Sequence, residues 1–381
     1  MIPKRNPFVF GPVVRDENFC GRRKEILDIR RTVEAGMHIV LYSRRRTGKT
    51  SLINRLFEEM RHTKRCVYLD LSRVTSQREF FEDYAEQVLK KSGTTYSSIR
   101  KLTDKLGKIL GHIDIRISAG PDGAFSFGLD PASLSAERIP DLLFLPERLG
   151  GKFVIAMDEY QNIVNLPGSY EMESFMRSII QNFRNTSVIF AGSRAHMMRN
   201  IFSNPQRPHY RLARAMSLGP LTEEEAIPFM SDKFSPGGYE MDESMLKEIF
   251  KTVEGDPYYL QALCFHCWNL LPSEYRFGQD DLRKAEENMM INEAMYFEAL
   301  WRYLAPGQKK VLKVIAEGEN PYGKKWIAKS STAQALKALS EKDLVEIPGK
   351  GIYRLTDPFL GKWVVNSLSG RIGTGAEEGQ P

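Results

Sequence analysis

The chain has 381 residues, more than one hydrophobic core usually organises, so its length predicts two or three domains. Hydrophobic residues make up 42% of it and charged residues 27%, a globular composition that excludes extensive disorder. No apolar run approaches the roughly 20 residues of a membrane span, and the basic start breaks into proline and glycine, so we expect a cytoplasmic protein. The net charge of +6 permits a polyanionic partner without demanding one.

The N-terminal part of the chain, up to Pro220, alternates apolar strands with amphipathic helices. Short runs rich in β-branched residues predict buried parallel strands at 37–42, 66–71, 153–159 and 187–193. Helical spacing predicts helices at 51–60, 78–93, 136–149 and 171–183. An alternating segment around Pro-Asp-Gly predicts a β-hairpin within 113–129. This order indicates an α/β domain whose parallel sheet carries helices on both faces.

After Pro220 the pattern becomes helical and then changes again. Thr222 and Glu225 form a capping box that opens a helical region reaching Tyr303. Residues 304–366 predict three helices and two strands joined by Gly-Lys-Gly, which is the layout of a winged helix. The polar tail is expected to be mobile. The predicted domains are an α/β domain at 1–220, an α-helical domain at 221–303, a winged helix at 304–366 and the tail at 367–381.

The four cysteines are too few for a disulfide scaffold, which fits a reducing compartment. Cys264 and Cys267 form a CxxC motif with His266 inside an apolar segment. Spacing of three residues places both thiols on one buried helix face, whereas structural zinc requires two further ligands. We therefore interpret this motif as part of a helix core.

The strongest chemical motif follows the first predicted strand. Residues 43–50, SRRRTGKT, end in the Gly48-Lys49-Thr50 of a Walker A loop, and Ser43 occupies the position of its first glycine. Backbone N–H groups of such a loop and of the following helix point inward and bind phosphates. Lys49 would reach the β- and γ-phosphates, and the Thr50 hydroxyl would bind Mg²⁺. Because serine is less favourable than glycine at positive φ, we expect a slightly different first turn.

Polar residues also end two later strands. The strand at 153–159 ends in Asp158, expected to bind Mg²⁺, and Glu159, expected to orient or deprotonate the attacking water. Ser193 ends the next strand, where it either senses the γ-phosphate or caps the following helix. Arg194 either stabilises charge on the γ-phosphate, in cis or at an oligomer face, or forms a surface ion pair. The predicted catalytic residues are therefore Lys49, Asp158, Glu159, Ser193 and Arg194.

Four segments together resemble the archaeal-type ATPases of the STAND class, within the AAA+ group of P-loop ATPases. They are NFCGRRKEI, RRRTGKTSL, MDEYQ and EGDPYYLQAL, and the resemblance runs from about Asn6 to Trp363. It implies an AAA+-like P-loop NTPase core, a helical lid, a C-terminal winged helix, and ATP with Mg²⁺ as ligands. It places Phe19, Gly21 and Arg22 beside the adenine and brings Gly255-Asp256-Pro257 of the lid to the nucleotide. The expected nucleotide-binding residues are then Phe19, Gly21, Arg22, Arg45, Arg46, Thr47, Gly48, Lys49, Thr50, Ser51 and Pro257.

Three classes of function follow from these motifs. The leading hypothesis is a slow, regulated ATPase that acts as a nucleotide-driven conformational switch. The alternative is a nucleotide-controlled DNA-binding regulator, because Lys337 and Lys342 outnumber Glu341 on the third helix of the winged helix. Further lysines lie nearby, namely Lys324, Lys325, Lys329 and Lys350. A scaffold that binds nucleotide without turnover is disfavoured by the Asp158-Glu159 pair.

The expected partners follow from the same reasoning. They are ATP or ADP and, at the winged helix, either duplex DNA or a protein, since winged helices bind both. A membrane is not expected as a partner. Oligomerisation is left open by the sequence.

Overall fold

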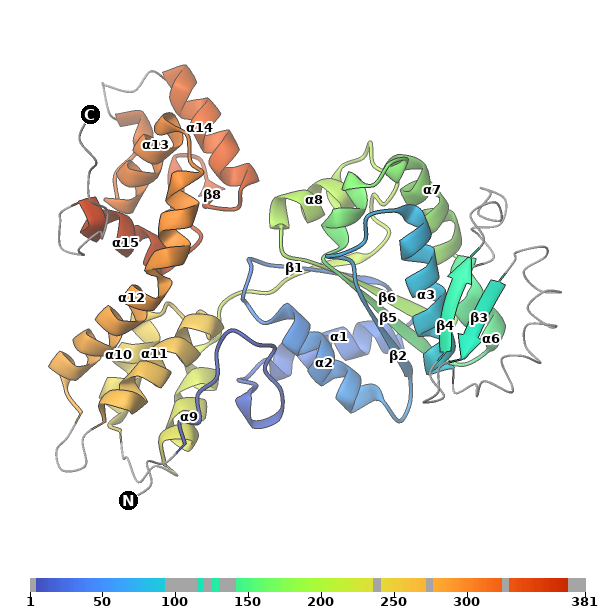
Figure 1. Cartoon of the computed structure of the whole chain (residues 1–381), viewed down its shortest axis with the longest axis horizontal. Coiled ribbons are helices and arrows are strands. Elements are labelled where there is room, and N and C mark those ends of the chain that lie inside the picture. The colour runs from blue at the N-terminus through green and yellow to red at the C-terminus, as the bar shows by residue number, and fades with distance from the viewer. Residues whose placement is uncertain are drawn as a thin grey trace. The chain divides into compact units, whose positions relative to one another are not determined.

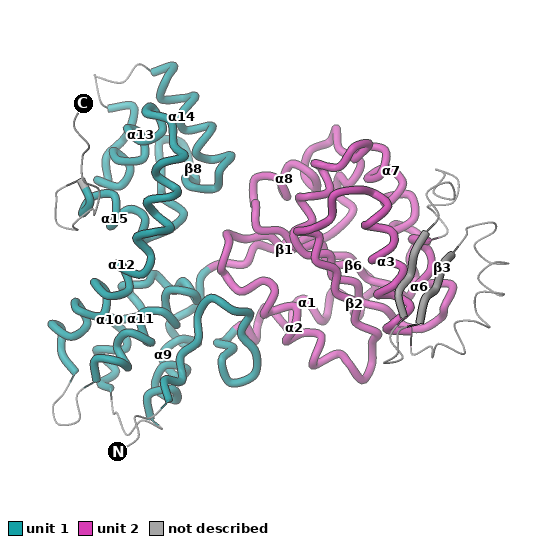
Figure 2. Tube along the Cα trace, viewed as in Figure 1, with its two compact units in different colours: residues 1–21, 220–381 teal, residues 22–219 magenta. Residues whose placement is uncertain are grey.

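The computed structural model describes residues 5–92, 142–235, 241–271, 277–323 and 329–368, together with the backbone of two strands at 115–119 and 125–129. The chain divides into two compact units (Figure 2). Unit 2 comprises residues 22–219, and unit 1 comprises residues 1–21 together with 220–381.

Unit 2 contains a five-stranded parallel sheet in the order β2-β5-β6-β1-β7. Its strands are β1 (Ile39–Tyr42), β2 (Arg65–Asp70), β5 (Phe153–Asp158), β6 (Thr186–Gly192) and β7 (Arg214–Ser217). The central strands β5 and β6 are buried along their whole length, which explains why their sequences are continuously apolar. Four of the strands were predicted from such runs. The fifth, β7, is a largely exposed edge strand with the sequence RAMS and was not predicted.

Helices cover both faces of this sheet, as predicted, with α1 and α2 on one face and α3, α7 and α8 on the other (Figure 1). The bounds are α1 (Arg23–Glu34), α2 (Lys49–Met60), α3 (Gln77–Lys91), α6 (Leu145–Leu149), α7 (Ser169–Ile180) and α8 (Ala195–Ser203). A 3₁₀ helix, η3 (Tyr160–Asn165), follows β5 directly. The α/β fold class is thereby confirmed.

The predicted hairpin is also present in unit 2. Strands β3 (Ile115–Ala119) and β4 (Phe125–Leu129) pair antiparallel, with Ile115 opposite Leu129 and Ala119 opposite Phe125. The Pro-Asp-Gly turn between them and residues 136–141 of the predicted helix at 136–149 lie outside the described residues.

Unit 1 is largely helical and ends in a small antiparallel hairpin followed by one more helix. Its elements are η1 (Asp16–Asn18), α9 (Glu223–Phe234), α10 (Glu243–Thr252), α11 (Pro257–Leu270), α12 (Gln279–Arg302), α13 (Pro306–Ala316), η5 (Pro321–Gly323), α14 (Lys329–Glu341), β8 (Val345–Gly349), β9 (Ile352–Leu355) and α15 (Pro358–Leu368). The capping box is present, since Glu225 Oε2 accepts a hydrogen bond from the backbone N–H of Thr222. Lys324 and Lys325 lie outside the described residues, as does most of the polar tail.

One hydrophobic core extends through unit 1, from α9 to α15. The rings of Phe297 on α12 and Trp363 on α15 pack 5.9 Å apart, and the Tyr259 hydroxyl donates to Asp357 Oδ2 at 2.8 Å. The helical region and the winged-helix region therefore share a core. Their division into separate domains at Leu304 stays a prediction.

The N-terminal segment, up to Gly21, belongs to unit 1, whereas the sequence-based division placed it in the α/β domain. The Phe8 ring lies 4.7 Å from that of Phe234 on α9. The backbone and side chain of Asn18 accept hydrogen bonds from Gln261 Nε2 (2.9 Å) and Lys233 Nζ (2.6 Å). Polar and aromatic contacts to α9 and α11 thus hold this segment against the helical region.

Cys264 and Cys267 are both buried in α11, and burial raises the pKa of each thiol. Their placement agrees with the interpretation of the CxxC motif as helix core. Within the described parts of the chain, no helix is long and apolar enough to cross a membrane.

Candidate functional site

The candidate site lies where the parallel strands β1, β5 and β6 of unit 2 end. In the sheet register Tyr42, the last residue of β1, pairs with Gly192, the last residue of β6, and Ser43 N donates to the Gly192 carbonyl at 3.3 Å. The Walker A loop therefore starts beside the segment that carries Ser193. Helix α2 begins at Lys49, directly after Gly48, whose φ of 88° lies in the left-handed region that favours glycine.

Ser43 anchors the loop through its side chain. It is buried, and its hydroxyl contacts the hydroxyl of Thr47 and donates to the Arg44 carbonyl at 3.1 Å. Thr47 donates to the same carbonyl at 2.9 Å. Among the described residues of the loop, positive φ occurs at Arg46 and Gly48 and does not occur at Ser43. The serine therefore occupies the first loop position without backbone strain and contributes hydrogen bonds that glycine lacks.

The ammonium group of Lys49 lies inside this loop. Its Nζ donates to Ser43 Oγ at 3.0 Å and to the Arg44 carbonyl at 2.9 Å, and only 5% of the residue is exposed. A helix N-terminus carries partial positive charge, and the lysine adds a full charge at the same place. The loop therefore concentrates positive charge and N–H donors, as phosphate binding requires.

Asp158, at the end of β5, joins three elements. Its Oδ2 accepts hydrogen bonds from Thr50 Oγ1 on α2 (2.6 Å) and from the Tyr68 hydroxyl on β2 (2.8 Å), and its Oδ1 accepts from Glu159 N (3.0 Å). The structure thus brings together the two residues predicted to bind Mg²⁺. Tyr68 was not predicted; burial and the neighbouring Asp158 raise the pKa of its phenol, which keeps it a neutral donor.

Glu159 adopts a left-handed backbone conformation with φ of 55°, which is unfavourable for a residue other than glycine. Its Oε2 accepts hydrogen bonds from Ser193 Oγ at 2.7 Å and from Gln161 Nε2. Ser193 and Gln161 are both buried. Ser193 therefore contacts the predicted base directly. Gln161 was not predicted, although it ends the MDEYQ segment of the resemblance.

The other predicted residues of unit 2 occupy different environments. Thr47 and Ser51 are buried in the loop and in the first turn of α2, whereas Arg45 and Arg46 are exposed. Arg194 precedes α8 and is half-buried, with its Nη1 3.6 Å from the sulfur of Met197. The roles of these three arginines stay predictions.

Arg22 is buried at the start of α1 in unit 2. Its Nη1 donates to Glu25 Oε1 at 2.9 Å and its Nη2 donates to the Gly219 carbonyl at 2.7 Å. The guanidinium thus binds the two ends of unit 2 together. Its predicted position beside adenine stays a prediction.

Phe19, Gly21 and Pro257 belong to unit 1, so the structure does not bring them together with the Walker A loop within one unit. Gly21 has a φ of 61°, and a Cβ atom there would lie 2.6 Å from the Glu225 side chain, so glycine is required. Pro257 is the first residue of α11, and Asp256 caps that helix by accepting from Tyr258 N at 2.9 Å. These geometries explain the residue types, and contacts with nucleotide stay a prediction.

Comparisons with known proteins agree with this arrangement. Residues 19–263 match a family described as an ATPase domain predominantly from Archaea, and residues 295–366 match a probable winged helix domain. The first match covers more than half of the chain, which therefore belongs to this family of ATPase domains. No curated protein matches the sequence significantly.

Two similar solved structures show the same fold. A Walker-type ATPase of Pyrococcus abyssi has a TM-score of 0.66 and 18% identity, over 94% of this chain and 99% of that chain. An ORC2 protein of Aeropyrum pernix, solved in ADPNP–ADP complexes, has a TM-score of 0.54 and 14% identity, over 94% and 98% of the two chains. At these identities the likeness concerns the fold alone.

Proposed function

We propose that the protein is a Mg²⁺-dependent ATPase of the STAND class, within the AAA+ group, that works as a nucleotide-driven conformational switch. The observation that carries the proposal is the pairing of Thr50 with Asp158 and of Ser193 with Glu159 where the strands beside the Walker A loop end. The four free thiols of the chain fit the cytosolic location expected from the sequence.

The residues around Asp158 fit Mg²⁺. A hydroxyl and a carboxylate, already 2.6 Å apart, are hard oxygen ligands, and Mg²⁺ at nucleotide sites commonly uses one or two protein ligands together with phosphate oxygens and water. Thr50 and Asp158 would hold the ion, with Tyr68 fixing the carboxylate. When bound, the ion would neutralise charge on the phosphates.

Within the proposed reaction, Lys49 would bind the β- and γ-phosphates once its Nζ exchanges the Ser43 and Arg44 oxygens for phosphate oxygens. Glu159 would accept a proton from the attacking water, with Ser193 and Gln161 holding its carboxylate. Hydrolysis would then change the relation between the two units, which is how the switch would act.

The basic test measures phosphate release from ATP by the purified chain, with Mg²⁺ or with excess EDTA, and with or without duplex DNA. We expect slow, Mg²⁺-dependent release that duplex DNA does not change, as for a switch awaiting a protein signal. Stimulation by DNA would favour a nucleotide-controlled DNA regulator. The absence of release in every condition would contradict the ATPase proposal.

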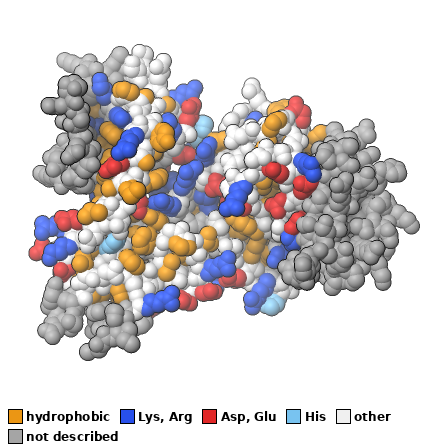
Figure 3. Space-filling model, viewed as in Figure 1, with side chains coloured by type: hydrophobic (Ala, Val, Ile, Leu, Met, Phe, Trp, Pro, Cys, Tyr) orange, Lys and Arg blue, Asp and Glu red, His pale blue; other side chains and the backbone are white. Residues whose placement is uncertain are grey.

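The DNA-binding alternative rests on exposed lysines of the winged helix. Lys337 is exposed in the second half of α14, Lys342 is exposed just after this helix, and Lys350 is exposed in the turn between β8 and β9. Lys337 lies 3.9 Å from Glu341, which offsets part of its charge. On the visible face, basic side chains of this region alternate with acidic and hydrophobic ones (upper left in Figure 3). A mixed surface of this kind also suits a protein partner.

Replacing Lys337, Lys342 and Lys350 with glutamate tests this alternative. If the winged helix binds duplex DNA, the triple variant should bind it more weakly, and each lost phosphate contact should flatten the slope of log affinity against log salt by about one. Fluorescence anisotropy at several salt concentrations measures both effects. ATP binding should be unchanged, since the three lysines lie outside unit 2. A wild-type chain without salt-sensitive affinity for duplex DNA would leave a protein as the partner of the winged helix.

A further inference from the structure

A buried polar network lies directly behind Glu159. The left-handed backbone of Glu159 is unfavourable and needs support from neighbouring residues. Strand β5 gives this support on the N-terminal side of Glu159. On the other side, Tyr160 is fully buried and its ring packs against Phe190 (4.8 Å) and Phe202 (5.7 Å). The position of Glu159 therefore depends on how firmly Tyr160 is held.

His209 holds the polar end of Tyr160. The Tyr160 hydroxyl and His209 Nε2 are 2.6 Å apart, and their rings are stacked with centroids 5.8 Å apart. His209 is fully buried, and burial together with the nearby Arg177 and Arg207 lowers the pKa of its imidazole to about 3. The ring is therefore neutral near pH 7. Among the described residues its Nδ1 has no hydrogen-bond partner, so Nε2 carries the polar contact of the ring.

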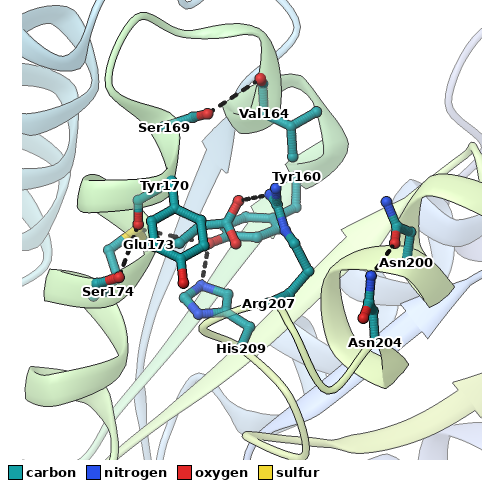
Figure 4. A network of polar contacts seen from close by, with 11 residues as sticks. Tyr160, Val164, Ser169, Tyr170, Glu173, Ser174, Asn200, Asn204, Arg207 and His209 are labelled. Carbon is teal, nitrogen blue, oxygen red and sulfur yellow. Dashed lines mark hydrogen bonds and ion pairs between the residues drawn. The ribbon is translucent and has the colours of Figure 1, made fainter.

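His209 is in turn fixed to α7. It lies in the loop of residues 204–213, between α8 and β7. Arg177 on α7 donates to the carbonyls on both sides of it, those of Pro208 at 2.6 Å and Tyr210 at 2.7 Å. Figure 4 shows Arg207 of the same loop pointing toward Glu173 on α7, and the half-buried guanidinium forms an ion pair with the buried carboxylate of Glu173. The contacts thus run without a break from α7 through the loop to Tyr160.

We propose that His209 is a positioning residue for ATP hydrolysis, which holds the carboxylate of Glu159 in place through Tyr160. The inference rests on the proposed ATPase function. The His209–Tyr160 hydrogen bond fixes the start of η3. It thereby fixes the direction of Glu159, which directly follows β5, and the position of Gln161 in η3. The role concerns turnover, and nucleotide binding at the Walker A loop is not part of it.

Two conservative variants test the inference. His209→Phe keeps an aromatic ring against Phe190 and Phe202, and Tyr160→Phe removes one oxygen atom. Each should lower kcat about ten- to hundredfold, because a small misplacement of a catalytic group costs rate on this scale. KM and the Kd for ATP should not change. The kcat of the double variant should be no lower than that of either single variant, since each single substitution already removes the His209–Tyr160 hydrogen bond. His209→Gln, whose Nε2 can again reach the Tyr160 hydroxyl, should restore part of kcat.

Tyr84→Phe is the matched control. Tyr84 is another buried tyrosine of unit 2, and its hydroxyl donates to the Leu143 carbonyl at 2.7 Å. This variant should lower Tm about as much as Tyr160→Phe and leave kcat unchanged, which separates positioning from a general loss of stability. If His209→Phe does not fold, Tyr160→Phe and its control carry the test.

The outcomes distinguish the inference from the proposed function. Wild-type kcat in the His209→Phe and Tyr160→Phe variants, or a loss equal to that of Tyr84→Phe, would overturn the positioning role alone. A double variant whose loss is the product of the single losses would also overturn it. A wild-type protein that releases no phosphate from ATP would overturn the proposed function, and this inference with it.

Discussion

Replacing Glu159 with glutamine should leave Mg²⁺–ATP binding intact and reduce turnover by a factor on the order of 10²–10⁴, the usual contribution of general-base catalysis. The amide cannot accept a proton from water, yet its oxygen can still accept hydrogen bonds from Ser193 Oγ and Gln161 Nε2. Asp158 and Thr50 are untouched, so the proposed Mg²⁺ ligands stay in place. Steady-state phosphate release gives kcat, and titration with a fluorescent ATP analogue gives the Kd.

A control for this variant is Glu58→Gln, which removes a half-exposed carboxylate of α2 in the same unit, whose Oε2 lies 3.8 Å from Arg55 Nη1. It should leave kcat and Kd unchanged. Near-wild-type turnover of Glu159→Gln in a preparation free of contaminating ATPase would assign the base to another residue. A loss of binding equal to the loss of turnover would instead assign Glu159 to the nucleotide pocket.

The sequence predicts most of the fold because burial leaves a clear pattern. Strands β5 and β6 are covered on both faces, so their residues form continuous apolar runs. The strand β7 is short, exposed and polar at Arg214 and Ser217, and therefore has no such run. The packing of the N-terminal segment in unit 1 has no local signal either, since it depends on partners far along the chain, such as Lys233 and Gln261.

In the candidate site, too, the residues with a local sequence signal were predicted, and those that depend on contacts far along the chain were not. Thr50, Asp158 and Ser193 were predicted because each ends a strand or begins a helix, and parallel strands bring such ends to one edge of the sheet. Tyr68 reaches Asp158 from the middle of a neighbouring strand, and His209 reaches Tyr160 from a loop beyond two further helices and a strand. Side chains that support a candidate catalytic group in this way are specified by packing, which the order of residues along the chain does not reveal.

Ser43 occupies the position of the first glycine of the Walker A loop. From residue types alone, this serine predicts a slightly different first turn of the loop. The structure shows no positive φ at that position, so a side chain is tolerated there, and its hydroxyl bonds the loop to Thr47 and Lys49. Gly48, whose φ is 88°, is the loop position where glycine matters.

Replacing Lys49 with alanine should weaken ATP binding about a hundredfold or more and leave the fold intact. Within the described loop, Lys49 supplies the buried ammonium group. Its loss would remove the two charge-assisted hydrogen bonds that we propose it makes to phosphate, worth ~1.5–3 kcal/mol each, which accounts for the size of the expected effect. The Arg44 carbonyl loses the hydrogen bond from Lys49 but still accepts hydrogen bonds from the hydroxyls of Ser43 and Thr47. The loop and the fold should therefore survive the substitution. Isothermal titration calorimetry with ATP gives the affinity, and thermal unfolding checks the fold.

Lys152→Ala is the control for this variant, because it removes an exposed lysine of the same unit, immediately before β5. It should bind ATP with wild-type affinity, so a loss confined to Lys49→Ala cannot be ascribed to the change in net charge. Lys49→Ala and Glu159→Gln are also distinguished by what they change, because we expect the first to affect ATP binding and the second to affect turnover. ATP binding that survives in Lys49→Ala with unchanged affinity would remove the Walker A loop from the proposed mechanism. The polar contacts around Asp158 would then have only a structural role.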